Sequence, residues 1–439
     1  MKLAAGALII IAALPLYLVR FSIGPIPTTL LETLLLIYIA FAVLKTRWRF
    51  FSAPHDKNER LIFIGGAFFL LGGILGLLVT NDIPSTLGIL KSYFVEPMFF
   101  ALVLRYILKS NERELFLRWL PIALIIPTII VSAVAVFQYA TGLWIPSAWS
   151  AERRVTGLFP YPNALGHFIA PVLVFLFSSF ILNNQVTKAS GRTLLLHAIF
   201  YITLAVGVFA VFLSKTEAAW VAIAVIIPIT ILIWAFRNLK NNQDHFFSPT
   251  KKVVRSTFTV VVAFGLIAIA SIFYFPTMRE KILLQDWSGK TRFAVWEETW
   301  TLATSSPRTM FLGVGANNYP NAIAPFHTHA YLEIFQYPHQ LFLNIWSESG
   351  LLGLLGFLLI SIAILRRTIS NSSIPQFFNS FSLPAFLALL EMSIHGLVDV
   401  PYFKNDLAIL AWLFIIIAMS EEKKLPLQSF GTPQLSDVF

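Results

Sequence analysis

The stretch Leu61-Ile-Phe-Ile-Gly-Gly-Ala-Phe-Phe-Leu-Leu-Gly-Gly-Ile-Leu-Gly-Leu-Leu-Val79 contains no charged residue. A helix of this length crosses the roughly 30 Å hydrocarbon core of a bilayer, and a soluble core does not need such length. Similar apolar runs recur along the chain, in which 57% of the 439 residues are hydrophobic and only 12% are charged. The sequence therefore predicts an all-α polytopic membrane protein.

We expect about twelve transmembrane helices in a single membrane domain, residues 1–439. The first run lacks a clean small-x-small cleavage site, so we expect an uncleaved helix and not a signal peptide. The predicted spans are 3–19, 28–44, 61–79, 86–108, 115–140, 162–182, 193–213, 217–236, 254–275, 340–365, 378–399 and 404–420.

Positive charge alternates between the loops that connect these spans. The cation-rich loops hold Lys45, Arg47, Arg49, Lys57, Arg60, Arg105, Lys109, Arg113, Arg118, Lys188, Arg192, Arg237, Lys240, Lys251, Lys252, Arg255, Arg366, Arg367, Lys423 and Lys424. The opposite short loops hold only Arg20, Arg153, Arg154, Lys215 and Lys404. The positive-inside rule then predicts a protein of the cytoplasmic (inner) membrane with both termini in the cytoplasm. Because this alternation explains the net charge of +10, nucleic acid is not an expected partner.

Two absences limit the function. The chain has no cysteine, so it forms neither a disulfide framework nor a thiolate metal site. The predicted cytoplasmic loops are no longer than about twenty residues and carry no G-x-x-x-x-G-K-[ST] motif. An ATPase or nucleotide-sugar-binding domain is therefore not expected on that side.

One long hydrophilic segment, 276–339, is predicted to lie on the outer (periplasmic) side between the ninth and tenth spans. Loops of this length usually have a function. Its aromatic residues suit a folded cap that contacts the membrane interface or sugar rings; they are Trp287, Trp296, Trp300, Tyr319, Tyr331 and Tyr337.

Ionisable residues gather at the outer ends of the predicted spans, where burial is costly unless the groups are paired or functional. The possible ion pairs Lys91–Glu96 and Lys215–Glu217 have a purely structural interpretation as well as a functional one. The other members are Arg153, Arg154, Arg292, His339, Glu348, Asp399 and Lys404.

Two segments of the outer region contain candidate site residues. Arg292 and Trp296 are four positions apart and so share one face of a predicted helix. Such an arginine can bind phosphate through two parallel hydrogen bonds, although an arginine over a tryptophan is often only a packing contact. His339 lies at the mouth of the tenth span, where histidine is commonly an ordinary interfacial residue. Gly350 and Gly353 in that span are expected to permit close helix packing.

Several motifs resemble the O-antigen ligase and O-antigen polymerase superfamily. They are Arg292-x-x-x-Trp296, Gly313-Val-Gly315, His339 with the run Asn344 to Gly353, and the segment Arg154-Val-Thr-Gly157 continuing to Pro162-Asn163. One motif departs from the family pattern. Where the family commonly has Ser-Arg-Gly-Ala, this chain has Ser214-Lys215-Thr216-Glu217-Ala218.

The resemblance implies a GT-C-like membrane glycosyltransferase that transfers a glycan from undecaprenyl pyrophosphate to an acceptor. It implies that His339 is the catalytic histidine and that Arg292 binds the pyrophosphate. The missing second arginine leaves Lys215, Arg153 or Arg154 to supply that charge, with Glu217 and Trp296 as further candidate substrate-binding residues. A glycan, lipid or protein acceptor is expected, and polysaccharide or lipopolysaccharide synthesis in the cell envelope is the expected setting.

A physical argument independent of the family leads to the same chemistry. Outside the cytoplasm no ATP is supplied, so a glycosyl donor must arrive activated, and cationic side chains can stabilise a departing pyrophosphate. His339 is the expected proton acceptor. No cofactor and no metal is expected, since adjacent Glu297 and Glu298 diverge by about 100° on a helix. The alternative is a transporter or flippase of lipid-linked glycans. A scaffold would not explain the ionisable residues.

Overall fold

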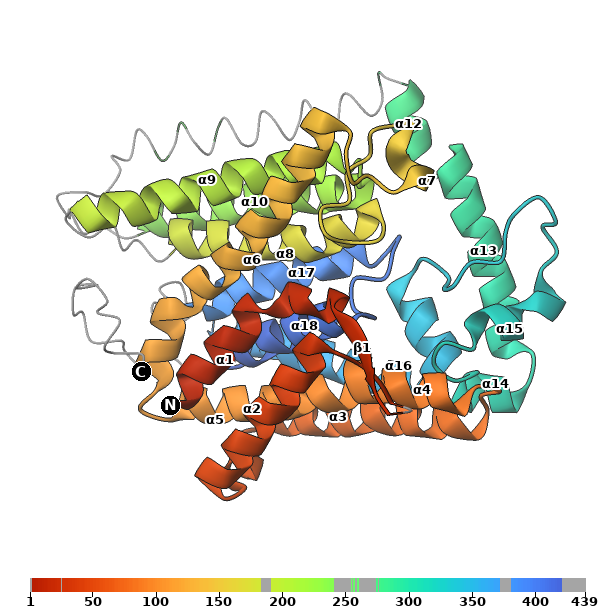
Figure 1. Cartoon of the computed structure of the whole chain (residues 1–439), viewed down its shortest axis with the longest axis horizontal. Helices are drawn as coiled ribbons and strands as arrows, with labels where there is room; N and C mark the ends of the chain where they lie inside the picture. The colour runs from red at the N-terminus through yellow and green to blue at the C-terminus, as the bar shows by residue number, and fades with distance from the viewer. Residues whose placement is uncertain are drawn as a thin grey trace.

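The computed structural model describes residues 2–24, 26–182, 191–240, 276–371 and 380–420, and the single positions 254, 256, 259 and 274. These residues are mostly helical (Figure 1). By length and composition, 7 of the described segments can cross a membrane. They are Lys57–Leu78, Ile83–Lys109, Arg113–Thr141, Pro162–Leu182, Leu195–Leu213, Glu217–Asn238 and Leu341–Asn371. The predicted multi-pass helical class is confirmed, and the count of about twelve stays a prediction.

The helices and strands follow one another along the chain in this order: α1 (Leu3–Ala12), η1 (Leu14–Leu18), β1 (Arg20–Ile23), β2 (Ile26–Thr29), α2 (Leu30–Thr46), η2 (Arg49–Phe51), α3 (Lys57–Leu75), η3 (Gly76–Leu78), α4 (Ile83–Ile89), the π-helical η4 (Leu90–Val95), α5 (Glu96–Lys109), α6 (Arg113–Thr141), α7 (Ser147–Ser150), α8 (Pro162–Leu182), α9 (Gly191–Leu213), α10 (Glu217–Lys240), α12 (Pro276–Ile282), α13 (Trp287–Thr304), α14 (Pro307–Leu312), α15 (Tyr319–Ile323), η5 (Ala324–Phe326), α16 (Leu341–Asn371), α17 (Ser382–His395) and α18 (Asn405–Ala418). The predicted ninth span, 254–275, lies outside the described residues except at its single positions.

The first two predicted spans differ from the structure. Helix α1 ends at Ala12, and a 3-10 turn containing Pro15 follows it. Strands β1 and β2 then pair antiparallel, so the fold is not entirely helical. The Thr29 hydroxyl and the Glu32 carboxylate form a capping box that starts α2 directly after the hairpin.

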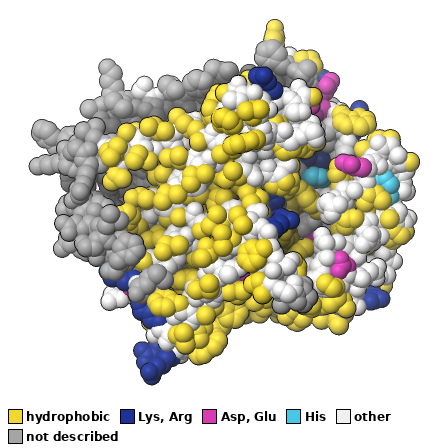
Figure 2. Space-filling model, viewed as in Figure 1, with side chains coloured by type: hydrophobic (Ala, Val, Ile, Leu, Met, Phe, Trp, Pro, Cys, Tyr) yellow, Lys and Arg dark blue, Asp and Glu magenta, His cyan; other side chains and the backbone are white. Residues whose placement is uncertain are grey.

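The surface of the helices is broadly hydrophobic in the view of Figure 2. Large apolar side chains such as Ile130 on α6, Phe209 on α9 and Val225 on α10 are exposed. A contiguous apolar surface of this kind matches the lipid contact expected of membrane-spanning helices.

Glycines allow α3 and α16 to approach closely. A Cβ on Gly72 would lie 2.6 Å from the backbone nitrogen of Gly353, and one on Gly65 would lie 2.7 Å from the Gly356 carbonyl. Gly353 therefore permits the close packing predicted for it. Gly350 differs, because its φ of 68° interrupts the helical backbone of α16 instead of continuing it. At that position only glycine adopts this conformation without strain.

Residues 276–339 contain α12 to α15 and η5, and we refer to this segment as the cap. These helices gather at one end of the bundle, at the right of Figure 1. Their own small core consists of Leu302, Val314, Tyr319 and Ile323. The amide of Val314 donates to the carbonyl of Ser347 on α16 at 2.7 Å, which ties the cap to the membrane helices. The side of the membrane on which the cap lies stays a prediction.

Candidate functional site

Helix α13 presents Arg292 and Trp296 to neighbouring backbone. Arg292 donates from Nε to the carbonyl of Val398 at 3.1 Å, and from Nη1 to the hydroxyl of Ser288 at 2.8 Å. Trp296 donates from Nε1 to the carbonyl of Pro338 at 3.0 Å. These two side chains, one turn apart, therefore hold two segments that are distant in sequence against the same helix.

His339 directly follows the Pro338 carbonyl that Trp296 contacts. Its backbone is left-handed, with φ 51°, and its ring centroid lies 4.6 Å from that of Tyr337. Nδ1 lies 3.3 Å from Oδ1 of Asp399, the residue after Val398. Arg292 and His339 thus meet at one short segment, although the cap separates them in sequence.

Asp399 is the centre of this arrangement. It lies between α17 and α18 and is 2% exposed. Its Oδ1 faces His339 and accepts the amide of Val400 at 2.9 Å, whereas Oδ2 accepts the side-chain amide of Asn163 at 2.8 Å. A buried carboxylate held by several donors is fixed in orientation, so it fixes His339 in turn.

Arg154 joins the same network through Asn163. It donates from Nη2 to Oδ1 of Asn163 at 3.2 Å, and from Nε to the carbonyl of Ser214 at 3.1 Å. The guanidinium also lies 4.9 Å from the centre of the Trp149 ring. Since Asn163 accepts from Arg154 and donates to Asp399, it couples a cation to the carboxylate beside His339.

The remaining predicted site residues contact other partners than His339. Arg153 is exposed with φ 48°, and Lys215 has φ 53° and donates to the carbonyl of Glu152 at 3.0 Å. Glu217 pairs with Lys281 of α12. Non-glycine residues with left-handed backbone are uncommon, and such conformations are enriched at functional sites. Arg153, Lys215 and His339 all adopt a left-handed backbone conformation, so the turns that contain them are candidate parts of the functional site.

Both predicted ion pairs were wrong. The ammonium of Lys91 lies 2.9 Å from Glu32 of α2, so Lys91 pairs with another helix and not with Glu96. Lys215 and Glu217 also diverge, because Lys215 is left-handed at the turn whereas Glu217 already begins α10.

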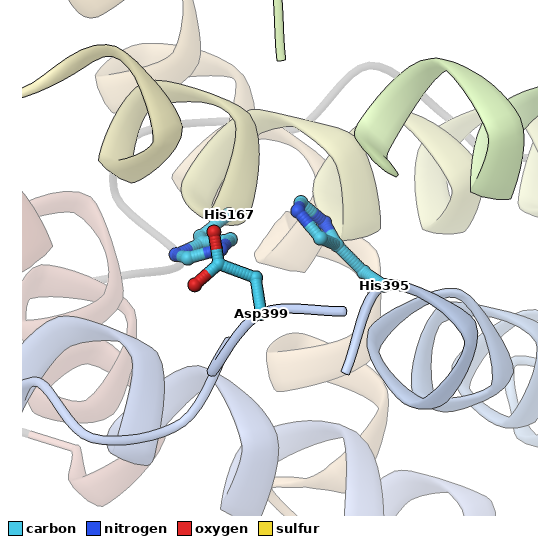
Figure 3. A group of neighbouring side chains, drawn as sticks. All are labelled: His167, His395 and Asp399. Carbon is cyan, nitrogen blue, oxygen red and sulfur yellow. The ribbon is translucent and has the colours of Figure 1, made fainter. Parts of the chain in front are cut away.

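Sequence reasoning missed three neighbours of Asp399. Asn163 belongs to a motif of the sequence, whereas His167 and His395 belong to none of the motifs described above. His167 lies one turn after Asn163 on α8, and this periodicity was an available signal. Figure 3 shows His167, His395 and Asp399 side by side. Each is a residue type that binds metal ions, and one ligand atom from each lies within 4.8 Å of the others.

A second polar cluster stabilises the cap. Glu298 is buried on α13, whereas its neighbour Glu297 is exposed, as the predicted divergence requires. One Glu298 oxygen lies 2.8 Å from Nδ1 of His329, and the other lies 3.1 Å from Nδ1 of His327. Burial by itself raises the pKa of Glu298, but hydrogen bonds from His329 and His327 lower this pKa to about 2. The cap therefore contains a carboxylate that is ionised at neutral pH.

The arrangement combines a supported histidine with cationic side chains. Figure 2 shows a hollow in the surface beside the apolar face, with Lys or Arg and His side chains near it. Within the described residues, neither Nη2 of Arg292 nor Nε2 of His339 makes a hydrogen bond. These groups can bind an anion and accept a proton, respectively.

The helices, the apolar surface and this polar site define a multi-pass membrane protein. The comparison with protein families matches residues 202–358 to the family described as O-antigen ligase. Residues 202–358 thus carry the match to the O-antigen ligase family, which confirms the resemblance to the O-antigen ligase and polymerase superfamily seen in the sequence motifs. The matched region contains Lys215, Glu217, Arg292, Trp296 and His339. The family indicates a membrane enzyme of the ligase or polymerase type that acts on glycans. No curated protein sequence matches the chain.

Proposed function

We propose that this protein is a GT-C-like glycosyltransferase of the cytoplasmic membrane, with both termini in the cytoplasm and its site on the outer face. It transfers a glycan from an undecaprenyl pyrophosphate carrier to a glycan, lipid or protein acceptor. The observation that carries the proposal is the convergence of Arg292, Arg154 and His339 on Asp399 and its neighbour Val398. The family match supports the class of reaction.

The pyrophosphate needs cationic partners as it leaves. We assign this role to Arg292, with Arg154 in place of the family's second arginine, because Asn163 connects Arg154 to the carboxylate beside His339. Lys215 and Arg153 lie on the adjoining turns and extend the positive charge. Preorganised donors of this kind contribute about 3 kcal/mol each when charge develops in a site that excludes water.

Transfer requires one bond exchange and one proton movement. The bond between the anomeric carbon and the pyrophosphate oxygen breaks, and a bond from the acceptor oxygen to that carbon forms. The acceptor hydroxyl gives its proton to Nε2 of His339, and the carrier keeps the pyrophosphate with the bonding electrons. Asp399 orients the imidazole through Nδ1 and stabilises its protonated form, a role that carboxylates have beside general bases.

Other residues position the site. Trp296 holds Pro338 and so the backbone that carries His339. Glu217 connects the start of α10 to Lys281 of the cap. The exposed rings of Trp287 and Tyr331, 5.9 Å apart on the cap, offer an apolar surface to the sugar units.

The charge on the donor is neutralised by side chains, so transfer needs no added magnesium or manganese. A single reaction tests the proposal: purified protein is incubated with a lipid-pyrophosphate-linked glycan and candidate acceptors, and release of free carrier is measured. We expect release that depends on an acceptor. Folded protein that releases no carrier with any acceptor class, or that is active only with magnesium or manganese, contradicts the proposal.

A further inference from the structure

We propose that His167, His395 and Asp399 form a binding site for a zinc-class divalent transition metal. The three residues come from α8, the last residue of α17 and the segment that follows it (Figure 3). Their exposed fractions are 1%, 0% and 2%. The site is thus enclosed by the membrane helices, behind the half-buried His339.

The ring nitrogens of both histidines are buried with too few partners. Within the described residues, none of the four ring nitrogens of His167 and His395 makes a hydrogen bond. Nε2 of His167 approaches Oδ2 of Asp399 to 3.2 Å, but without the geometry of a hydrogen bond. A buried polar atom without a partner costs roughly 1–3 kcal/mol. Nδ1 of His167 and Nε2 of His395 have no partner, and the other two ring nitrogens only approach the carboxylates of Asp399 and Glu391, so the cluster points to a ligand.

The donor set favours a particular kind of ion. Two imidazoles and one carboxylate are ligands typical of zinc and of neighbouring transition metals, whereas magnesium and calcium prefer oxygen alone. The three ligand atoms lie within 4.8 Å of one another, and ligands about 2.1 Å from a common ion are at most about 4.2 Å apart. Small side-chain rotations therefore suffice to bring all three to one ion.

The residues around the three proposed ligands are arranged as in a site with a bound ion. Nδ1 of His395 lies 3.4 Å from Oε1 of Glu391, so a proton on Nδ1 leaves Nε2 available to the metal. A carboxylate behind a metal-binding histidine is a common arrangement that fixes the ring. A bound ion would also explain why Glu391 is fully buried, because the two positive charges of the ion would balance the negative charges of Glu391 and Asp399. The amide of Asn163 holds Oδ2 of Asp399 at 2.8 Å.

Such an ion would hold Asp399 without touching the glycan donor. Oδ2 faces His167, whereas Oδ1 faces His339. The ion would therefore fix the carboxylate that orients His339, and it is compatible with transfer that needs no magnesium. The inference does not depend on the proposed function, because ion content and unfolding are measured without a substrate.

The test is the metal content of the full-length protein, purified in detergent without chelator. We expect about one zinc-class ion per chain in the wild type. His167→Gln and His395→Gln should lose most of it, whereas His197→Gln on α9, outside the cluster, should keep it. Retention of the ion by folded His167→Gln and His395→Gln would place it elsewhere and overturn the proposal.

A second measurement uses the wild type alone, so it tests the proposed metal site even where a variant does not fold. After removal of metal by a chelator, Zn²⁺ should raise the unfolding temperature, because an ion that binds only the folded state stabilises it. Co²⁺ should produce the visible absorption of a cobalt site with nitrogen and oxygen ligands. Protein that contains no stoichiometric metal, shows no shift with Zn²⁺ and stays colourless with Co²⁺ would instead have an ion-free cluster of these side chains.

Discussion

Nδ1 of His339 lies 3.3 Å from Oδ1 of Asp399, although the two residues are 60 positions apart in sequence. One ring nitrogen is thereby directed to a buried carboxylate while the other remains available. This relationship joins the cap, which carries His339, to the segment between α17 and α18, which carries Asp399. The first two predictions follow from it.

Replacement of His339 by Ala should lower turnover by about 10²- to 10⁴-fold, the usual contribution of a general base. Donor binding and folded yield should change little, because proton transfer contributes chiefly in the transition state. The measurement is the steady-state rate of carrier release, with His197→Ala on α9 as a control histidine outside the site. A near-normal rate in folded His339→Ala would exclude the histidine as the base.

Replacement of Arg292 by Lys should reduce transfer about tenfold, a loss of about 1.4 kcal/mol of transition-state stabilisation. The lysine keeps the charge but cannot contact Val398 and Ser288 with one planar group while also presenting a donor to the pyrophosphate. Arg279→Lys, on exposed α12 of the same cap, is the matched control and should be unaffected. Equal rates for both variants would mean that Arg292 is only a packing residue and does not bind the pyrophosphate.

Local features of the site could be predicted from the sequence. The four-residue spacing of Arg292 and Trp296 determines their shared face on any helix, and α13 includes both. The folded cap could be expected from its aromatic residues, among which Tyr319 is buried in the cap core. The divergence of Glu297 and Glu298 follows from helix geometry in the same way.

Contacts between distant segments could not be predicted. The approach of Asp399 to His339 depends on how α17 returns to the end of the bundle, and no local pattern encodes that path. The same limit applies to Lys91, whose partner is Glu32 of α2 and not Glu96 nearby in the sequence. A single histidine in an apolar run, such as His395, likewise carries no sign of its neighbours.

The location of the cap tests the predicted topology. A reporter that is active only in the cytoplasm should be silent when fused within 305–325, because the distribution of Lys and Arg places this region outside. The same reporter fused within 183–190, in a predicted cytoplasmic loop, should be active. An active fusion within 305–325 would reverse the topology and remove the basis for an outer-face mechanism.

The pH dependence of the cap should follow Glu298 and its two histidines. Because the folded-state pKa of Glu298 is lowered to about 2, its contribution to stability is complete above the ordinary value of 4.5 and is lost as the pH falls towards 2. The hydrogen bond with Glu298 raises the pKa of His327, so that contribution is complete below about 6.5 and is lost as the pH rises through the raised value. Hydrogen exchange of cap amides should therefore be slowest between these limits.

Glu298→Gln and Glu297→Gln provide the matched comparison for this prediction. Glu298→Gln should flatten the pH profile, because it removes the charge that faces both histidines and lies near Tyr319. Glu297→Gln removes the same charge one position away, on the exposed side of α13, and should leave the profile unchanged. Identical profiles for the two variants would mean that the cluster does not stabilise the cap.

The contact between α3 and α16 should be intolerant of even one added methyl group. A Cβ on Gly72 would lie 2.6 Å from the backbone of both Gly353 and Ser349, and backbone atoms cannot move aside as a flexible side chain can. Gly72→Ala should therefore destabilise the protein by about 1–3 kcal/mol, the usual cost of overpacking, and lower the yield of folded protein. Gly88→Ala, where a Cβ meets nothing within 4 Å, is the control and should fold at least as well as the wild type. The unfolding temperature in one detergent measures both, and a Gly72→Ala protein as stable as Gly88→Ala would show that α3 and α16 are not held as closely as the structure places them.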